Sequence, residues 1–452
     1  MLPNLCRVLA QFKVQGAKKL GSDEELTQLC RELGMTWRKR LLTPIVTLRV
    51  FFLQILHGNV GFDALPHLAG FSFSGSAYCA ARQRLPLELL QRLLSHVTRQ
   101  LLLAGPLANA DRWLGHRVFI ADATGFSLPD TPPLQKHFGQ APNQKPGCGF
   151  PVAFCLLLMH YGSGVIQRLV AAPLRTNEVS LLPLTHHELA EGDIVVGDSS
   201  FGNFVQLALL AERGVWGLFR LARRRVVDFT PHRPHVPPGK HCPSAPHSRW
   251  RQQLGQLDQI VDWYKPPHCP PWMTPAQWER LPEVLTVREL RYRITRCGFR
   301  VREVTLVTTL LDAQRYALAA LADLYRQRWT IETNIRHLKI TLKMDALHSQ
   351  TVEGVHKELL MFCLVYNLVR LVMAQAAQAQ HVPITHISFL DALRWLLYTA
   401  DPTPPQRLIT LYLRPQRHEP RVVKRRSKHY PLLTRPRTEL RNSLLLHQLL
   451  AK

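Results

Sequence analysis

Three carboxylates in this sequence stand where strands and a helix could bring them to one site. Asp122 and Asp198 follow the apolar runs 117–121 (RVFIA) and 193–197 (DIVVG), each typical of a strand buried on both faces. Open sheets place their chemistry at the carboxyl ends of strands. Glu332 follows much later, in a segment with helical periodicity. Taken singly, either aspartate is better explained as a turn or helix cap, so the hypothesis depends on all three residues together.

Such a set of carboxylates suits metal-dependent phosphodiester cleavage. That reaction needs a deprotonated water or hydroxyl as nucleophile and positive charge at the phosphate, and two Mg²⁺ ions about 3.5–4 Å apart supply both. Mg²⁺ prefers oxygen ligands and keeps several waters, so a few carboxylates suffice. We expect Asp122 to bridge two Mg²⁺ ions while Asp198 and Glu332 each hold one, with Mn²⁺ able to substitute. Serine-type catalysis is disfavoured, because the chain has no G-x-S-x-G motif.

The segment around Glu332 predicts one amphipathic helix over residues 325–343, YRQRWTIETNIRHLKITLK. On a wheel of 3.6 residues per turn, one phenol and a row of cations share the face of the glutamate. These residues are Tyr325, Arg328, Arg336, Lys339 and Lys343. Because the cations outnumber the acid, some of them are expected to neutralise DNA phosphates. The alternative is an exposed helix with an ordinary ion pair between Glu332 and Arg336.

The charge of the chain indicates a polyanionic partner. Its 452 residues contain 57 Lys and Arg against 32 Asp and Glu, a formal net charge of +25. Such an excess raises the affinity for nucleic acid and predicts salt-sensitive binding. A basic membrane-surface protein is the competing class, but we find no anchor, and no transmembrane helix or signal peptide is expected. Nine cysteines without a C-x2-C pair indicate reduced, intracellular thiols and no zinc module.

Changes of periodicity divide the chain into five parts. Residues 1–110 are predicted to form an all-helical N-terminal domain that binds DNA. Residues 111–222 are the first part of an α/β domain, and 306–400 are its second part, with the Glu332 helix. Between them, 223–305 form a β-rich insertion. Residues 401–452 are a basic C-terminal tail, which either touches DNA phosphate or is simply solvated.

One segment of the N-terminal part is a candidate DNA-reading helix. Ser74 is a helix-capping residue, and Arg82 and Arg84 follow it in SGSAYCAARQRL. Either these arginines face DNA, or the segment is an ordinary bundle helix with solvated arginines.

The residues of the predicted Glu332 helix match a known family signature. The spacing Tyr325-x2-Arg328-x3-Glu332-x6-Lys339 resembles the Y-x2-R-x3-E-x6-K signature of DDE transposases of insertion sequences, in the insertion-sequence-four group. IADATGFSLPD and IVVGDSSFGNF are similar to the first and second Asp motifs of that family. LVTTLLD, LYRQRWTIE and KHYPLLTRPR are also similar to family segments. The resemblance covers roughly residues 40–435.

This resemblance implies the fold and the site. It implies a ribonuclease H-like catalytic domain of the α/β class, interrupted by a β-rich insertion before the Glu332 helix. It implies that Asp122, Asp198 and Glu332 are the metal triad. It also implies that Tyr325, Arg328 and Lys339 contact the element end. Arg336 shares their face outside the signature and is a further candidate DNA contact.

The resemblance also implies an activity. We expect cut-and-paste transposition, with hydrolysis at the ends of the element and attack of the freed 3′-hydroxyl on target DNA. The partners are double-stranded DNA, at the terminal inverted repeats and the target, and a second copy of the chain in a homodimer. The expected location is the cytoplasm of a prokaryote, with the nucleoid.

In one respect the sequence departs from the family. Well-studied members that form a hairpin at the element end carry a tryptophan in the strand before the Glu helix. Here that strand, 304–311, has none, and Trp272 or Trp278 of the insertion are the candidate substitutes. Two other functions remain as alternatives. One is a catalytically silent DNA-binding regulator or transposition inhibitor, and the other is a ribonuclease H-like nuclease without strand transfer.

Overall fold

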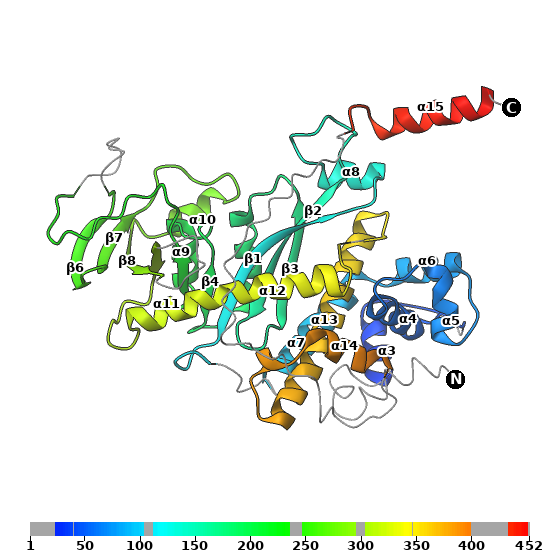
Figure 1. Cartoon of the computed structure of the whole chain (residues 1–452), viewed down its shortest axis with the longest axis horizontal. Helices are drawn as coiled ribbons and strands as arrows, with labels where there is room; N and C mark the ends of the chain where they lie inside the picture. Colours follow the sequence, from blue (N-terminus) through cyan, green and yellow to red (C-terminus); the bar gives the residue numbers. More distant parts are fainter. Residues whose placement is uncertain are drawn as a thin grey trace.

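A large sheet runs through the middle of the molecule (Figure 1). The computed structural model describes residues 23–38, 40–103, 112–235, 246–294, 303–345, 347–398 and 433–450. Within them, nine strands form one sheet in the order β3-β2-β1-β4-β5-β9-β8-β7-β6. The strands are β1 (Val118–Ser127), β2 (Val152–His160), β3 (Ile166–Pro173), β4 (Ile194–Gly197), β5 (Trp216–Arg220), β6 (Arg249–Gly255), β7 (Asp258–Tyr264), β8 (Val284–Arg293) and β9 (Glu303–Thr308).

The strand directions divide the sheet into two halves. β1, β2 and β3 form an antiparallel meander, and β4 and β5 run parallel to β1. β9 pairs antiparallel with β5, and β8, β7 and β6 continue outward from it, all antiparallel. The strands of the predicted β-rich insertion therefore extend the same sheet and do not form a separate one.

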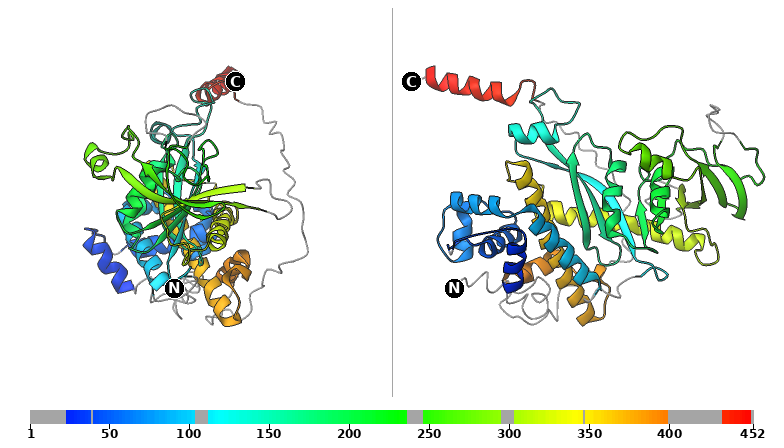
Figure 2. Two further views of the ribbon diagram at one scale, coloured as in Figure 1. Left: turned by 90° about the vertical axis from the view of Figure 1, so that its left-hand side faces the viewer. Right: turned by 180° about the vertical axis from the view of Figure 1, so that it is seen from behind.

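The helices cover the sheet and build an adjoining layer at the end of β1–β3. They are α3 (Asp23–Glu32), α4 (Pro44–Leu56), α5 (Leu65–Ala69), α6 (Gly75–Arg84), α7 (Leu87–Leu103), α8 (Pro132–Phe138), α9 (Phe204–Ala211), α10 (Pro275–Arg280), α11 (Leu318–Arg326), α12 (Thr330–Arg336), α13 (Val352–Gln380), α14 (Phe389–Tyr398) and α15 (Arg437–Leu450). Among the residues described between 23 and 103, all regular elements are helical. The last helix, α15, projects away from the rest (Figures 1 and 2).

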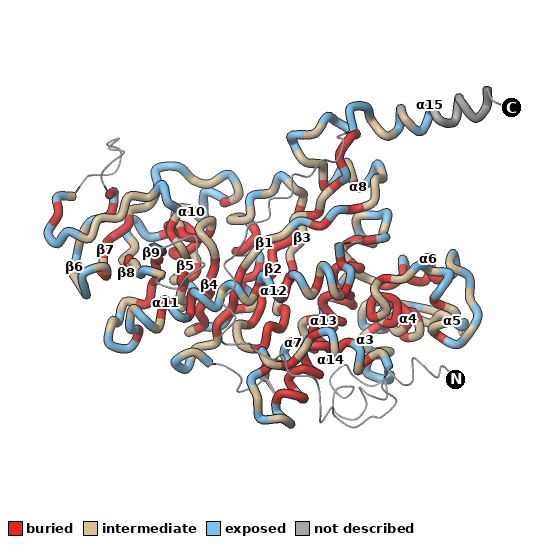
Figure 3. The backbone as a smooth tube through the Cα atoms, viewed as in Figure 1, coloured by how far each residue is buried: buried red, intermediate tan, exposed pale blue. Residues whose placement is uncertain are grey.

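Helix α13 is the centre of the helical layer (Figure 3). Side chains from α4, α7 and α13, such as Phe51, Leu90 and Phe362, belong to one continuous hydrophobic core. Among the described helices, α13 is the one long and apolar enough to cross a membrane. However, 94% of its most apolar window is buried inside the molecule. It is therefore the core helix against which the N-terminal helices and the sheet pack.

The two faces of β1 pack against different layers. Phe119 and Ala121 point into a core with α9, whereas Val118 and Ile120 point to the side of α11, α12 and α13. Because side chains alternate along a strand, Asp122 lies on the α12 side with Ile120. The sheet thus directs its first aspartate toward the helix that carries Glu332.

Candidate active site

The register between β1 and β4 places the two aspartates side by side. Ile120 pairs with Val196 in the parallel ladder, and each aspartate follows its partner of that pair by two residues. The two carboxylates are close enough to affect one another electrostatically. In one detail the sequence prediction was wrong, because Asp122 does not end its strand. After leaving β4, β1 continues to Ser127 by pairing with β2, so Asp122 lies in mid-strand opposite Leu157.

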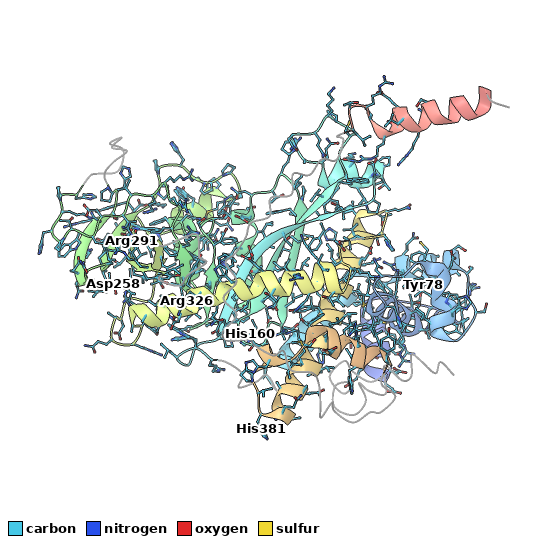
Figure 4. All side chains as sticks on the ribbon, in the orientation of Figure 1. Tyr78, His160, Asp258, Arg291, Arg326 and His381 are labelled. Carbon is cyan, nitrogen blue, oxygen red and sulfur yellow. The ribbon has the colours of Figure 1, made fainter. Side chains whose placement is uncertain are left out.

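The predicted uniform helix over 325–343 is a composite. The helix α11 ends at Arg326, labelled in Figure 4, and a 3₁₀ turn (η4, Gln327–Trp329) leads into α12. A π-helical segment (η5, His337–Thr341) follows α12. Both departures from 3.6 residues per turn rotate the side chains that follow them. The cations therefore do not share the single helix face that regular α-helical geometry predicts, and their side chains point in different directions.

Arg328 connects the sheet to the Glu332 helix. Its guanidinium lies 3.7 Å from Asp122 Oδ2 and 3.6 Å from Glu332 Oε1. Arg328 and Asp122 are largely buried, with 12% and 20% of their side chains exposed, whereas Glu332 is 46% exposed. The Nε atom of Arg328 is buried and has no hydrogen-bond partner within the described part of the chain. One cation therefore lies in contact with two of the three predicted ligands.

The environment of Asp122 disfavours its charge. The pKa of Asp122 is raised to about 6, mainly by burial and to a smaller extent by the carboxylates of Asp198 and Glu332. Arg328 acts in the opposite direction, as does the backbone N–H of Ala123, which donates to Asp122 Oδ1 at 3.0 Å. Burial therefore outweighs the stabilisation of the Asp122 carboxylate by Arg328 and by the backbone N–H.

A fourth carboxylate, which sequence reasoning missed, stands next to Asp198. The backbone N–H of Ser200 donates to Asp198 Oδ1 at 2.8 Å, and the side chain of Ser200 is hydrogen-bonded to Glu178. Burial raises the pKa of Glu178, and the charge of Asp198 adds to this. Glu178 begins a short 3₁₀ helix (η2, Glu178–Ser180) that follows β3. No spacing rule in the sequence links it to the aspartate motif.

Tyr325 supports Arg328 from inside the protein. Its ring is 4% exposed and belongs to the core beneath β4 and β5. Burial raises the pKa of Tyr325, and its phenol is hydrogen-bonded to Arg328. The structure therefore places Tyr325 behind the arginine, not on an open surface.

The remaining cations of the predicted row are dispersed. Lys339 donates from Nζ to the carbonyl oxygen of Gly125 at 2.8 Å and so ties η5 to β1. Arg336 is exposed in the last turn of α12. Lys343 has a positive φ of 60°, and its side chain lies over Gly58 at the end of α4. Lys339 is thus bound to the strand of Asp122, Arg336 follows Glu332 by one helical turn, and Lys343 is not part of the site.

The aromatic residues of the insertion lie elsewhere. Trp272 and Trp278 pack against the core on the α9 side of the sheet, opposite the face of Asp122. In contrast, Trp329 lies on the Glu332 helix and is 41% exposed, with the guanidinium of Arg328 5.7 Å from its ring. Its position directly after Arg328, a residue of the family signature, could have identified Trp329 as the tryptophan near the site.

Arg82 of α6 fits neither expectation, because its side chain is neither free to face DNA nor solvated. Its guanidinium stacks 3.8 Å from the ring of Phe51 and donates to Gln54 Oε1 at 3.2 Å, and only 7% of the residue is exposed. The DNA-reading interpretation is wrong for Arg82, because the side chain is part of the core beside Tyr78 (Figure 4). Arg84 is exposed. The basic segment 414–428 lies outside the described residues.

The donor set of this site fits a hard divalent cation. Within the described residues, no three His, Cys, Asp or Glu side chains stand close enough to hold an ion as they are, and the Arg328 guanidinium touches both Asp122 and Glu332. The three converging carboxylates supply oxygen ligands of the kind that Mg²⁺ and Mn²⁺ prefer. The raised pKa of Asp122 shows that further positive charge is favourable there.

Comparisons with known proteins agree with this chemistry. The chain matches the family model described as "Transposase DDE domain" over residues 113–368, more than half of its length. It is 25% identical over 377 residues to "Transposase InsG for insertion sequence element IS4" of Escherichia coli (strain K12), which covers 79% of this chain and 78% of that protein. A shorter match, 30% identical over 105 residues, is to "Putative transposase InsZ" of the same organism and covers 23% of this chain and 35% of that protein.

A solved structure is also similar. The piggyBac transposase synaptic complex with hairpin DNA matches with a TM-score of 0.41 and 10% sequence identity, over 88% of this chain and 80% of that one. Proteins of the matched family are enzymes that cut and join DNA strands with divalent metal ions. The extent of the family match decides the assignment, and the chain therefore belongs to the DDE transposases of insertion sequences.

Proposed function

We propose that this transposase moves its element by a cut-and-paste route, and that Asp122, Asp198 and Glu332 are its metal ligands. The observation that carries the proposal is the contact of one guanidinium, Arg328, with Asp122 and Glu332, beside Asp198. Carboxylates from two strands and a helix are directed toward one another, and burial disfavours the charge of the first of them, Asp122. These carboxylates would hold two Mg²⁺ ions, which would activate the attacking water or hydroxyl and stabilise charge on the phosphate.

Arg328 has a second task in this proposal. A guanidinium forms bidentate hydrogen bonds with phosphate, and the Nε of Arg328 is free of partners among the described residues. It can therefore turn from the carboxylates toward a DNA phosphate when the ligands are neutralised. Tyr325 holds it from behind through the phenol hydrogen bond.

Other residues of the helix extend the DNA contact. Lys339 and Arg336 add positive charge along the strand that carries the scissile phosphate. The exposed ring of Trp329 offers a surface on which a nucleobase stacks. We assign the base-stacking role to Trp329 and not to Trp272 or Trp278, because those two pack on the opposite face of the sheet.

The fold is part of the proposal. The order β3-β2-β1-β4-β5, with an antiparallel meander and two strands parallel to β1, supports a ribonuclease H-like core. β6 to β8 are then an insertion before the Glu332 helix. We propose that two copies of the chain act together on paired ends of double-stranded DNA, in the cytoplasm where nucleoid DNA is accessible.

A cleavage and joining assay tests the function. The purified chain is incubated with supercoiled DNA that carries its own element's ends, with Mg²⁺ or with EDTA. End-specific double-strand cuts and joined products that require Mg²⁺ support the proposal. Binding without any cut would indicate a catalytically silent regulator, and cuts without joining of precut ends would indicate a nuclease.

A further inference from the structure

A pocket outside the metal triad is lined in part by Ser199 and Ser200, which directly follow Asp198 in the sequence. It has a volume of about 600 Å³ and is formed by the loops that follow the parallel strands β4 and β5. Its lining is rich in hydrogen-bond donors and in guanidinium groups, namely Asn177, Ser199, Ser200, Asn203, Arg224 and Arg225. No carboxylate lines it among the described residues. The loops approach closely because Gly202 has no side chain, and a Cβ there would lie 2.3 Å from the carbonyl oxygen of Arg220.

Arg225 is held in a fixed orientation within this pocket. Its guanidinium lies flat 3.5 Å from the ring centre of Trp263, a residue of β7 that is 1% exposed. Trp263 in turn donates from Nε1 to Glu289 at 2.8 Å, and Glu289 is fully buried and also accepts from Gln259. The stack on an aromatic ring and the buried anchor behind it preorganise the guanidinium.

The hydrogen-bonding capacity of Arg225 is unused. In the part of the chain that the structure describes, its guanidinium has neither a hydrogen bond nor an ion pair, and Trp263 is its contact. Burial lowers the pKa of Arg225, while the charge of Glu289, the buried carboxylate behind Trp263, acts in the opposite direction. A cation in this situation is stabilised by an anionic ligand that offers two oxygens to the guanidinium fork.

We propose that this pocket binds a backbone phosphate of the DNA strand that lies next to Asp198, with Arg225 as the bidentate contact and Arg224 as a second cation. The inference deepens the proposed function and depends on it in one respect, that DNA is engaged at Asp198. Hydroxyl and amide donors beside arginine are the usual contacts to phosphate. No aromatic side chain lines the pocket among the described residues, so it offers no ring on which a nucleobase could stack, and this favours the backbone as its ligand.

The salt dependence of DNA binding tests the pocket. Fluorescence anisotropy with a labelled duplex measures the dissociation constant over a range of NaCl concentrations, in EDTA, so that the result does not depend on the metal triad. One phosphate contact contributes about 0.9 to the slope of log K against log salt for duplex DNA. We expect Arg225→Gln to weaken binding several-fold and to reduce the slope by about that amount. Arg225→Lys should restore the slope but not the full affinity, because the fork is lost.

Two further variants make the outcome decisive. Arg213→Gln removes the same charge from an exposed residue that precedes β5, at the end of that strand opposite the pocket, and should leave the slope unchanged. Asn177→Asp keeps the acceptor for the N–H of Val179, now at 3.2 Å, and adds an anion to the pocket without touching the Arg225 stack. It should weaken binding even if Arg225→Gln folds poorly. Equal slopes for Arg225→Gln and Arg213→Gln, or normal binding by Asn177→Asp, would overturn the proposal. If the slopes are as expected but the wild-type protein does not cleave DNA in Mg²⁺, the result counts against the metal triad and not against the phosphate pocket.

Discussion

The guanidinium of Arg328 lies 3.7 Å from the carboxylate of Asp122, so a cation of the Glu332 helix is held against the first aspartate of the sheet. This contact joins two segments that are distant in the sequence. In the site without metal ions, Arg328 partly neutralises the negative charge of Asp122 and Glu332.

The pKa of Asp122 makes stability depend on pH. Its folded-state pKa of about 6 lies above the ordinary value of 3.8, so the folded protein binds this proton more tightly than the unfolded chain does. The stabilisation is fully present below pH 3.8 and is lost as pH rises through about 6. Relative to Asp122→Asn, the metal-free wild type should lose roughly 3 kcal/mol of unfolding free energy across this range. Denaturant titrations in EDTA at several pH values measure the difference, and parallel pH curves for the two proteins would contradict it.

Neutralising the triad should separate catalysis from binding. Asp122→Asn, Asp198→Asn and Glu332→Gln keep the size of each side chain but remove a metal ligand. Each should lower the rate of end cleavage by about a thousandfold, equivalent to about 4 kcal/mol of transition-state stabilisation. DNA affinity in gel-shift assays should be equal or higher, since negative charge near the phosphates decreases. A variant that cleaves normally would remove that residue from the triad.

Tyr325→Phe tests whether the phenol acts through Arg328. The substitution keeps the buried ring and removes the hydrogen bond to the guanidinium. We expect a thermal stability close to wild type and a slower cleavage rate, with a smaller effect in an Arg328→Ala background than in the wild type. Independent effects of the two changes would show that Tyr325 contacts DNA directly.

Glu178 and Ser200 should tune the metal affinity of Asp198. Groups that hold a metal ligand in orientation typically contribute 10–100-fold to metal affinity. Glu178→Gln and Ser200→Ala are therefore expected to weaken Mn²⁺ binding, measured by electron paramagnetic resonance, by roughly tenfold or more. Glu212→Gln, an exposed carboxylate at the end of α9, serves as the control. Unchanged Mn²⁺ affinity in both variants would exclude a supporting role.

The local patterns of the sequence were sufficient to predict that Asp122, Asp198 and Glu332 lie near one another. They were not sufficient to predict the backbone geometry around these residues. The apolar run before Asp122 predicted a buried strand, yet its continuation to Ser127 depends on pairing with β2, a long-range contact without a local signal. The wheel assumed regular α-helical geometry around Glu332. The 3₁₀ turn at Gln327–Trp329 and the π segment at His337–Thr341 are tertiary adjustments that such a wheel cannot contain.

Residues that act through others were the hardest to predict. Glu178 lies in a short 3₁₀ helix and reaches Asp198 through Ser200, so its relevance appears only when the chain is folded. Arg82 shows the reverse, because a basic residue of a basic protein proved to be a core residue stacked on Phe51. A surplus of positive charge therefore predicts the class of partner but not which arginine meets it.

The continuity of the sheet has a mechanical consequence. β9 is hydrogen-bonded to β5 through the pairs Leu218–Thr308, Phe219–Val307 and Arg220–Leu306, and β8 continues from β9 without a break. The insertion is therefore no hinged flap, because swinging it would break the ladder that follows directly from the Asp198 half of the sheet. A force applied to β6 or β7 would therefore act, through continuous ladders, on the strands that carry Asp122 and Asp198.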